Sequence, residues 1–166
     1  MLDQSTQSPW TAFQPRRQTA PERTVEIEAA DSLRLMLVDD DPEDQIRMLT
    51  AAVGGGLGNF VDYVSSGKDA IRALRRPGAR LPDIVLLETC LHDIPGRDVL
   101  RWIKSRHPQI AVIGLSNYAS PDFVRKLYAE GLSCFMRKPF TIQGFLLALG
   151  VLPAQYGITL TRPVVG

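Results

Sequence analysis

The chain has 166 residues, enough for one domain with a full hydrophobic core and short tails. Nineteen Lys and Arg against eighteen Asp and Glu give a net charge of +1, which argues against bulk nucleic-acid binding. The longest apolar stretch, 145–152, is too short to span a bilayer, no secretory signal is visible, and the two cysteines lack metal-site or CxxC spacing. A cytoplasmic protein with reduced thiols is therefore expected.

Strand-like and helical patterns alternate between two aperiodic tails. Residues 1–31, rich in Gln, Ser, Thr and Pro, are interpreted as a disordered arm, and 151–166 as a tail with one β-like segment at 156–161. Within a predicted domain at 32–150, strands are expected at 33–38, 60–64, 81–88, 110–115 and 133–136. Helices are expected at 42–54, 66–75, 96–107, 120–131 and 141–150. This alternation predicts a parallel sheet with helices on both faces.

Capping signals support three of the helix starts. Asp41 precedes Pro42 and is expected to be the N-cap of the first helix, with acidic residues in its first turn. Ser66 and Asp69 form a capping-box pattern at the second helix, and Ser120 before Pro121 is expected to cap the fourth.

The strand expected at 81–88 organises the rest of the domain. Its apolar run is continuous, opens with Pro82 and ends in the carboxylate of Glu88. A continuous apolar run is typical of a parallel strand that is buried on both faces. Because ligands of open α/β sheets bind beyond the carboxyl ends of the strands, Glu88 is expected to lie at the functional site.

Polar residues also follow three other strands of the predicted sheet. Asp39 and Asp40 follow the first strand, Ser116 ends the fourth and Lys138 follows the fifth. Parallel strands end at one edge, so these groups should meet Glu88 there. Three clustered carboxylates raise at least one pKa unless cations offset them, and Lys138 or Mg²⁺ would supply the offset. The alternative is that Asp39 and Asp40 are solvated turn residues.

Several of these motifs together resemble a known family. The segment from Val38 to Pro42, the run from Pro82 to Leu87, Ser116 and the segment from Lys138 to Phe140 are similar to the receiver domain of two-component response regulators. The resemblance extends from about residue 33 to residue 150, in the order and spacing of the family. It implies an α/β, flavodoxin-like (βα)5 doubly wound parallel sheet with strand order 2-1-3-4-5.

The resemblance also implies a role for each residue at the predicted edge. Glu88 stands where the family has its phosphoacceptor Asp, and the Mg²⁺ ligands would be Asp39, Asp40, Glu88 and the backbone carbonyl of Cys90. The switch pair would be Ser116 and Phe135, and Lys138 would pair with the phosphoryl group or carboxylate.

The sequence departs from the family pattern at the acceptor. Glu88 replaces Asp, and His92 and Pro95 are further departures nearby. Glutamate is longer by one methylene and carries one negative charge, where phosphorylation adds about −1.5 to −2. An Å of misplacement costs about 10²-fold in transfer rate, so Glu88 is expected to be a poor acceptor. We expect weak Mg²⁺ binding, with Lys138 as the direct partner of Glu88.

Two classes of function remain. The first is a stand-alone, non-enzymatic receiver that needs no phosphorylation, carries Glu88 as a phosphoaspartate mimic and binds a histidine kinase or a downstream effector. Its binding surface would be the fourth helix, fifth strand and fifth helix, which would also serve a homodimer and includes Arg125, Lys126, Tyr128, Phe135 and Arg137. No nucleic-acid or membrane partner is expected, because only a short tail follows the fifth helix.

Two alternatives to this receiver stay open. One is a conventional receiver phosphorylated at a non-standard residue. The other is an enzyme, a phosphatase with an aspartyl nucleophile in the Asp39-x-Asp41 sequence. The enzyme is disfavoured by Glu43, where that family usually has Thr or Val, and by the lack of a connection long enough for a cap domain.

Overall fold

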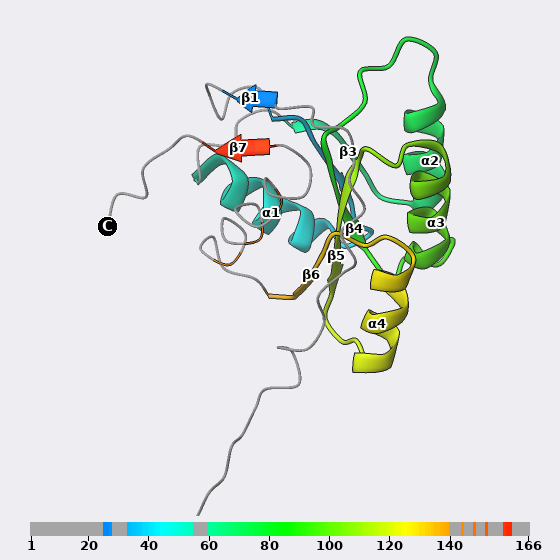
Figure 1. The fold of residues 1–166 in the computed structure, drawn as a ribbon. Helices are drawn as coiled ribbons and strands as arrows, with labels where there is room; N and C mark the ends of the chain where they lie inside the picture. The colour runs from blue at the N-terminus through cyan, green and yellow to red at the C-terminus, as the bar shows by residue number, and fades with distance from the viewer. Residues whose placement is uncertain are drawn as a thin grey trace, which may run out of the picture.

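The computed structural model describes residues 25–27, 33–54, 60–139, 144, 148, 152 and 158–160. Seven strands and four helices lie in this part of the chain (Figure 1). In order they are β1 (Val25–Ile27), β2 (Leu35–Val38), α1 (Pro42–Gly54), β3 (Phe60–Val64), α2 (Gly67–Arg75), β4 (Ile84–Glu88), α3 (Gly96–Arg106), β5 (Ala111–Ser116), α4 (Pro121–Ala129), β6 (Cys134–Arg137) and β7 (Ile158–Leu160). The predicted helix at 141–150 lies outside the described residues except for Gly144 and Ala148, which are helical.

Five of the strands form one parallel sheet in the order β3-β2-β4-β5-β6. Counting these five strands along the chain gives 2-1-3-4-5, so the predicted topology is confirmed. The central strand β4 pairs along its whole length with β5, from Ile84 opposite Ala111 to Glu88 opposite Leu115. Its five residues are all buried, as the continuous apolar run predicts. The strand begins at Ile84, three residues later than expected.

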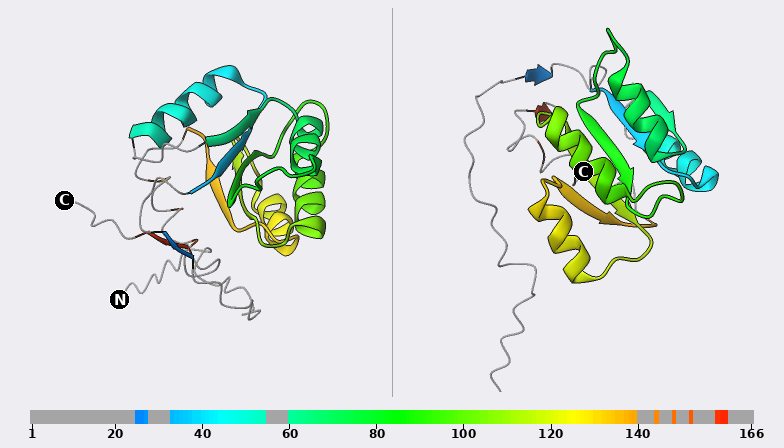
Figure 2. Two further views of the ribbon diagram at one scale, coloured as in Figure 1. Left: turned by 90° about the horizontal axis from the view of Figure 1, so that it is seen from above. Right: turned by 90° about the vertical axis from the view of Figure 1, so that its right-hand side faces the viewer.

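Helices cover both faces of this sheet, α1 on one and α2, α3 and α4 on the other (Figure 2), and a hydrophobic core lies on each face. Successive side chains of a strand point to opposite faces, so Leu35 and Leu37 pack with Met48 of α1, while Met36 packs with α2, α3 and α4. The side chains of β4 alternate in the same way, and that of Leu86 packs in the core on the α1 side of the sheet. Because both faces are covered, the backbone of the central strands is shielded from water and its polar groups pair within the sheet.

The predicted N-caps are present where α1, α2 and α4 begin, just after the carboxyl ends of the preceding strands. Asp41 Oδ1 accepts the backbone N–H of Glu43 at 2.8 Å. Ser66 Oγ accepts the N–H of Asp69 at 3.1 Å and donates to its carboxylate at 2.8 Å, and Ser120 Oγ accepts the N–H of Phe123 at 3.2 Å. These side chains occupy helix N–H groups that have no intrahelical acceptor.

A second, two-stranded parallel sheet joins β1 to β7. Strand β7 lies within the β-like segment expected at 156–161. Strand β1 lies within 1–31, so the expectation of an arm without regular structure is wrong at residues 25–27. Three residues are too few to show a hydrophobic period, so β1 has no local signal in the sequence. Among the described residues, no helix is long and apolar enough to cross a membrane.

Candidate functional site at the carboxyl ends of the strands

Four strands bring polar side chains to one edge of the sheet. Asp39 follows β2, Glu88 ends β4, Ser116 ends β5, and Lys138 follows β6 one residue after Arg137. Sequence separations of up to about a hundred residues are closed because the strands are parallel and their carboxyl ends coincide. Asp39, Glu88, Ser116 and Lys138 are all buried, with exposed fractions of 5% or less.

The Lys138 ammonium group lies at the centre of a carboxylate cluster, which we call the Lys138 cluster and define as Asp39, Asp44, Glu88 and Lys138. Its Nζ is 2.5 Å from Asp39 Oδ2, 2.6 Å from Glu88 Oε2 and 2.9 Å from Asp44 Oδ2. An ammonium group has three donor hydrogens, so these contacts use its full capacity. The predicted pairing of Lys138 with Glu88 is thus present in the structure.

Lys138 is the one cation that all three carboxylates share, and Arg47 lies 3.3 Å from the second oxygen of Asp44. Burial raises the pKa of Asp39, and repulsion from Glu88 adds to this, although the hydrogen bond from Lys138 works against it. Burial alone would lower the pKa of Lys138, but hydrogen bonds to Asp39, Glu88 and Asp44 outweigh it and raise that pKa above its ordinary value. Lys138 therefore stays charged, and the cluster depends on that charge.

Both carboxylate oxygens of Glu88 are occupied. Oε2 faces Lys138, and Oε1 accepts the backbone N–H of Cys90 at 2.8 Å. Behind the strand end, a Cβ added at Gly96 would approach the carbonyl oxygen of Glu88 too closely and would lie 2.7 Å from Cα of Thr89. Glycine at the start of α3 therefore allows that helix to pack directly against the segment that orients Glu88.

Asp40 does not take part in the Lys138 cluster. Its Oδ2 accepts the backbone N–H of His92 at 3.0 Å and lies 2.6 Å from His92 Nδ1. In this structure the two carboxylates of the predicted acidic pair have different partners: Asp39 faces Lys138, and Asp40 faces the loop after β4. Successive residues point in different directions where the chain leaves the strand, so adjacency in sequence does not bring the carboxylates together.

The two predicted switch residues lie on different elements and have different surroundings. Ser116 Oγ donates to the carbonyl of Tyr118 at 3.0 Å and accepts the N–H of Tyr118 at 3.3 Å. Its hydroxyl group thus caps its own turn, and among the described interactions it does not contact Glu88. Phe135 is partly buried against the core on the α2–α4 side of the sheet.

Polar contacts join α4 and the residue after it to β6 and α3. The backbone N–H of Phe135 donates to the hydroxyl of Tyr128 at 3.0 Å, which ties β6 to α4, and burial raises the pKa of Tyr128. Arg97 of α3 binds Glu130, just after α4, and Arg101 lies 3.3 Å from the same carboxylate. The position of α4 is therefore coupled to both neighbours.

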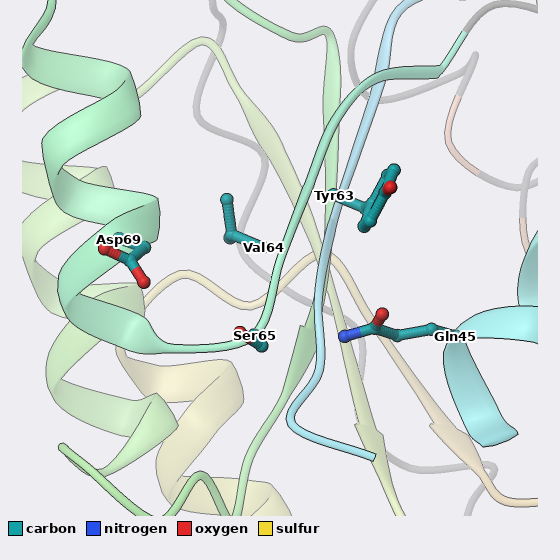
Figure 3. A pocket seen from close by; sticks show the side chains of 5 residues that line it. All are labelled: Gln45, Tyr63, Val64, Ser65 and Asp69. Atoms are coloured by element: carbon teal, nitrogen blue, oxygen red, sulfur yellow. The ribbon is translucent and has the colours of Figure 1, made fainter. Parts of the chain in front are cut away.

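A shallow pocket of about 240 Å³ lies at the carboxyl end of the edge strand β3. Figure 3 shows its lining, with Gln45 on α1 and Asp69 on α2 on either side of β3. Gln45 Nε2 already donates to the carbonyl of Asp39 at 2.5 Å, and Asp69 is bound by Ser66 and Arg72. The Gln45 and Asp69 side chains of the pocket are therefore engaged within the protein.

The residues expected to hold Mg²⁺ do not fit that ion in this arrangement. Lys138 Nζ lies where Asp39 and Glu88 converge, and Asp40 is bound to His92. Cys90 contributes its N–H to Glu88, and its thiol lies 3.8 Å from Ser116 Oγ. In the described ranges, no three His, Cys, Asp or Glu side chains are grouped so that they would hold a metal. Mg²⁺ needs near-octahedral oxygen ligands, and an ammonium group competes for the same oxygens.

Two residues of the site were not foreseen as such. Asp44 was assigned only to the favourable end of the α1 dipole, yet it is the third carboxylate on Lys138. His92 was noted as a departure from the family pattern, but not as the partner of Asp40. The signal for Asp44 was present, since the first turn of α1 begins at the same sheet edge as Asp39.

The sequence model of the response regulator receiver domain family matches residues 35–149. Sensor kinase CckA of Brucella abortus is 31% identical over 126 residues, which cover 75% of this chain and 13% of CckA. The probable transcriptional regulatory protein TcrX of Mycobacterium tuberculosis is 32% identical over 128 residues, 75% of this chain and 51% of TcrX. The structure of the bacteriophytochrome response regulator AtBRR matches with a TM-score of 0.66 and 27% identity, covering 80% of this chain and 97% of that one. The chain spans about half or less of the two curated relatives.

Proposed function

Because the chain belongs to the response regulator receiver family of two-component signalling, we propose that it is a receiver that works without phosphorylation. In this proposal Glu88 stands at the phosphoacceptor position and its carboxylate replaces the phosphoryl group. The observation that carries the proposal is the buried contact of 2.6 Å between Glu88 Oε2 and Lys138 Nζ. A charge-assisted bond of this kind is about twice as strong as a neutral one.

In the proposal, the contact with Lys138 connects Glu88 to β6 and, through β6, to α4. The backbone N–H of Lys138 donates to the carbonyl of Ser116 at 2.8 Å, which fixes Lys138 to the end of β5. Three residues earlier, Phe135 donates its N–H to Tyr128 of α4. A change in the contact between Glu88 and Lys138 would therefore alter the position of β6 and, through β6, the position of α4.

The mimic is proposed to engage Lys138 and not the switch residue Ser116. Glu88 contacts Lys138, whereas Ser116 is bonded to Tyr118. A carboxylate has one charge and two oxygens, fewer than a phosphoryl group, and here those oxygens contact Lys138 and the N–H of Cys90. We therefore propose a state fixed part-way toward the active one.

The proposed output is a protein–protein contact. The surface formed by α4 and β6 exposes Arg125, Lys126 and Arg137, with Tyr128 and Phe135 partly buried beside them. A downstream effector, a histidine kinase or a second copy of the chain would bind there. The alternatives are a conventional receiver phosphorylated at another residue and, less favoured, an aspartyl phosphatase. The phosphatase is less favoured because both aspartates of its proposed site are engaged: the Asp39 carboxylate binds Lys138, and the Asp41 carboxylate caps α1.

Incubation with acetyl phosphate and Mg²⁺ tests the independence from phosphorylation. We expect the intact mass of the protein to stay unchanged, because Glu88 is displaced by a methylene and neutralised by Lys138. An adduct of one phosphoryl group at Glu88 would contradict the proposal, and one at another residue would favour the conventional receiver. Turnover of a generic phosphomonoester, lost in Asp39→Asn, would favour the phosphatase.

Weak Mg²⁺ binding is the corresponding expectation for the metal. Lys138 shares the oxygens of Asp39 and Glu88 that the ion would need, and Asp40 would have to leave His92. Titration calorimetry should therefore show at most millimolar affinity. Micromolar binding that is lost in Asp39→Asn would show that the carboxylates rearrange around the metal.

A further inference from the structure

A basic surface lies at the end of the domain opposite the Lys138 cluster. In parallel βαβ units the helices run back toward the strand starts, so α2 and α3 both end there (Figure 1). We define the α2–α3 basic surface as Trp102 together with the exposed arginines at these helix ends and in the loop after α2. Its arginines are Arg75, Arg76, Arg80 and Arg106.

These four guanidinium groups have no acidic partner among the described residues. All four side chains are exposed, and none forms an ion pair with an acidic residue in the part of the chain that the structure describes. Other arginines on the same helices are paired: Arg72 with Asp69, and Arg97 and Arg101 with Glu130. The α2–α3 basic surface is thus the part of these helices and the following loop whose arginines form no ion pair with an acidic side chain among the described residues.

A group of acidic side chains lies at the other end of the domain. The Lys138 cluster contains three carboxylates there, and Asp40 and Asp41 follow Asp39 in the chain. At the strand-start end, Asp83 directs its carboxylate to the backbone N–H of Arg34 at 2.9 Å. Among the described residues, the Lys138 cluster and the four arginines of the basic surface thus lie at opposite ends of the domain.

Trp102 gives the basic surface an aromatic centre. The guanidinium carbon of Arg75 lies 5.3 Å from the centroid of the indole ring, and the ring of His107 is 5.7 Å away at 59°. The Nε1 of Trp102 is buried, and among the described residues it has no hydrogen-bond acceptor. Buried indole N–H groups usually have one, and an unmet donor costs stability. A ligand that brings an acceptor would remove this deficit.

From these observations we propose that the α2–α3 basic surface binds an acidic, extended segment of a partner protein. Guanidinium groups bind carboxylates with two parallel hydrogen bonds, and Arg75, one of the four exposed arginines, lies over the face of the indole ring. A long nucleic acid or a wide anionic membrane would extend over the acidic end and be repelled, whereas a short peptide contacts the basic end alone.

This site is separate from the α4–β6 surface. Its residues lie on the far ends of α2 and α3, and none contacts the Lys138 cluster among the interactions of the described residues. Binding there is expected to be the same in wild type and in Glu88→Gln. Failure of the proposed function and failure of this proposal are thus distinguishable.

Tryptophan fluorescence provides a local readout. The chain has two tryptophans, so the Trp10→Phe variant isolates the signal of Trp102. Titration of this variant with an oligoglutamate peptide should change the Trp102 emission in a saturable manner that weakens with added salt, and an oligoglutamine peptide of the same length should not. Arg75→Gln and Arg106→Gln, each in this background, should weaken binding by about tenfold.

Lys68→Gln is the matched control. It removes one positive charge from the exposed N-terminal end of α2, so its affinity for the peptide should match the parent. Equal weakening by Lys68→Gln and Arg75→Gln, or no emission change with oligoglutamate, would overturn the proposal. Tighter binding of oligothymidine, or of vesicles of equal phosphatidylserine and phosphatidylcholine, would replace the acidic peptide with that ligand class. Thermal unfolding of each variant confirms that it is folded.

Discussion

Replacement of Lys138 by Met should lower the free energy of unfolding by about 3–5 kcal/mol. The substitution keeps much of the apolar volume but leaves Asp39, Asp44 and Glu88 buried without their common cation. Urea titration of wild type and variant at neutral pH measures the difference. Lys68→Met, at an exposed lysine, is the control and should stay within about 0.5 kcal/mol of wild type.

The pH dependence of this loss identifies its cause. As pH falls through the carboxyl range, the uncompensated carboxylates take up protons and the deficit of Lys138→Met should shrink. At alkaline pH the sign is opposite: the folded pKa of Lys138 is raised, so its contribution is complete below 10.5 and is lost as pH rises toward the folded value. The double variant Glu88→Gln/Lys138→Met should recover part of the stability. A deficit that is independent of pH would show that the cluster is held by packing instead of charge.

Replacement of Gly96 by Ala should cost about 1–3 kcal/mol and disturb the site itself. The new Cβ would meet the backbone at Glu88 and Thr89, which cannot turn away as a side chain does. Either α3 or the end of β4 must therefore move, and the second movement would lengthen the contact between Glu88 and Lys138. Urea titration gives the stability, and a crystal structure of the variant gives the displacement.

Gly114→Ala is the matched control for this clash. Its Cβ would meet the flexible ends of Leu132 at 3.2 and 3.3 Å, so small side-chain adjustments suffice. We expect a loss below about 1 kcal/mol there. Equal losses in the free energy of unfolding for Gly96→Ala and Gly114→Ala would mean that the start of α3 can shift at little cost. The start of α3 would then not fix the position of Glu88.

The strands and helices of the main sheet could be predicted from the sequence because their signals are local, whereas the strand order was implied by the family resemblance. Most strands contain a run of apolar residues, although Asp62 interrupts β3, and the caps at Ser66 and Ser120 depend on residues within one turn. The strand ends then placed Asp39, Glu88 and Lys138 at one edge through topology alone. The pairing of Lys138 with Glu88 followed from charge, because a buried cation and carboxylate at such an edge have few other partners.

The directions of the other polar side chains could not be predicted in this way. Asp40 turns to His92 and Ser116 to Tyr118, and each choice depends on loop geometry that has no hydrophobic period. Asp44 joins the cluster because α1 begins beside Lys138, a contact across 94 residues. Strand β1 needs β7 as a partner, so neither three-residue segment specifies the pair by itself.

Amide NMR spectra of wild type and Glu88→Gln test most directly whether Glu88 sets the state of the domain. The substitution keeps the size of the side chain and removes its charge, which weakens the hold on Lys138. Glu88 as a phosphoryl mimic predicts shifts that extend along β6 to Phe135 and Tyr128 on the α4 surface. Shifts confined to Cys90, Lys138 and their immediate neighbours would contradict it and identify Glu88 as an inert replacement in a fixed scaffold.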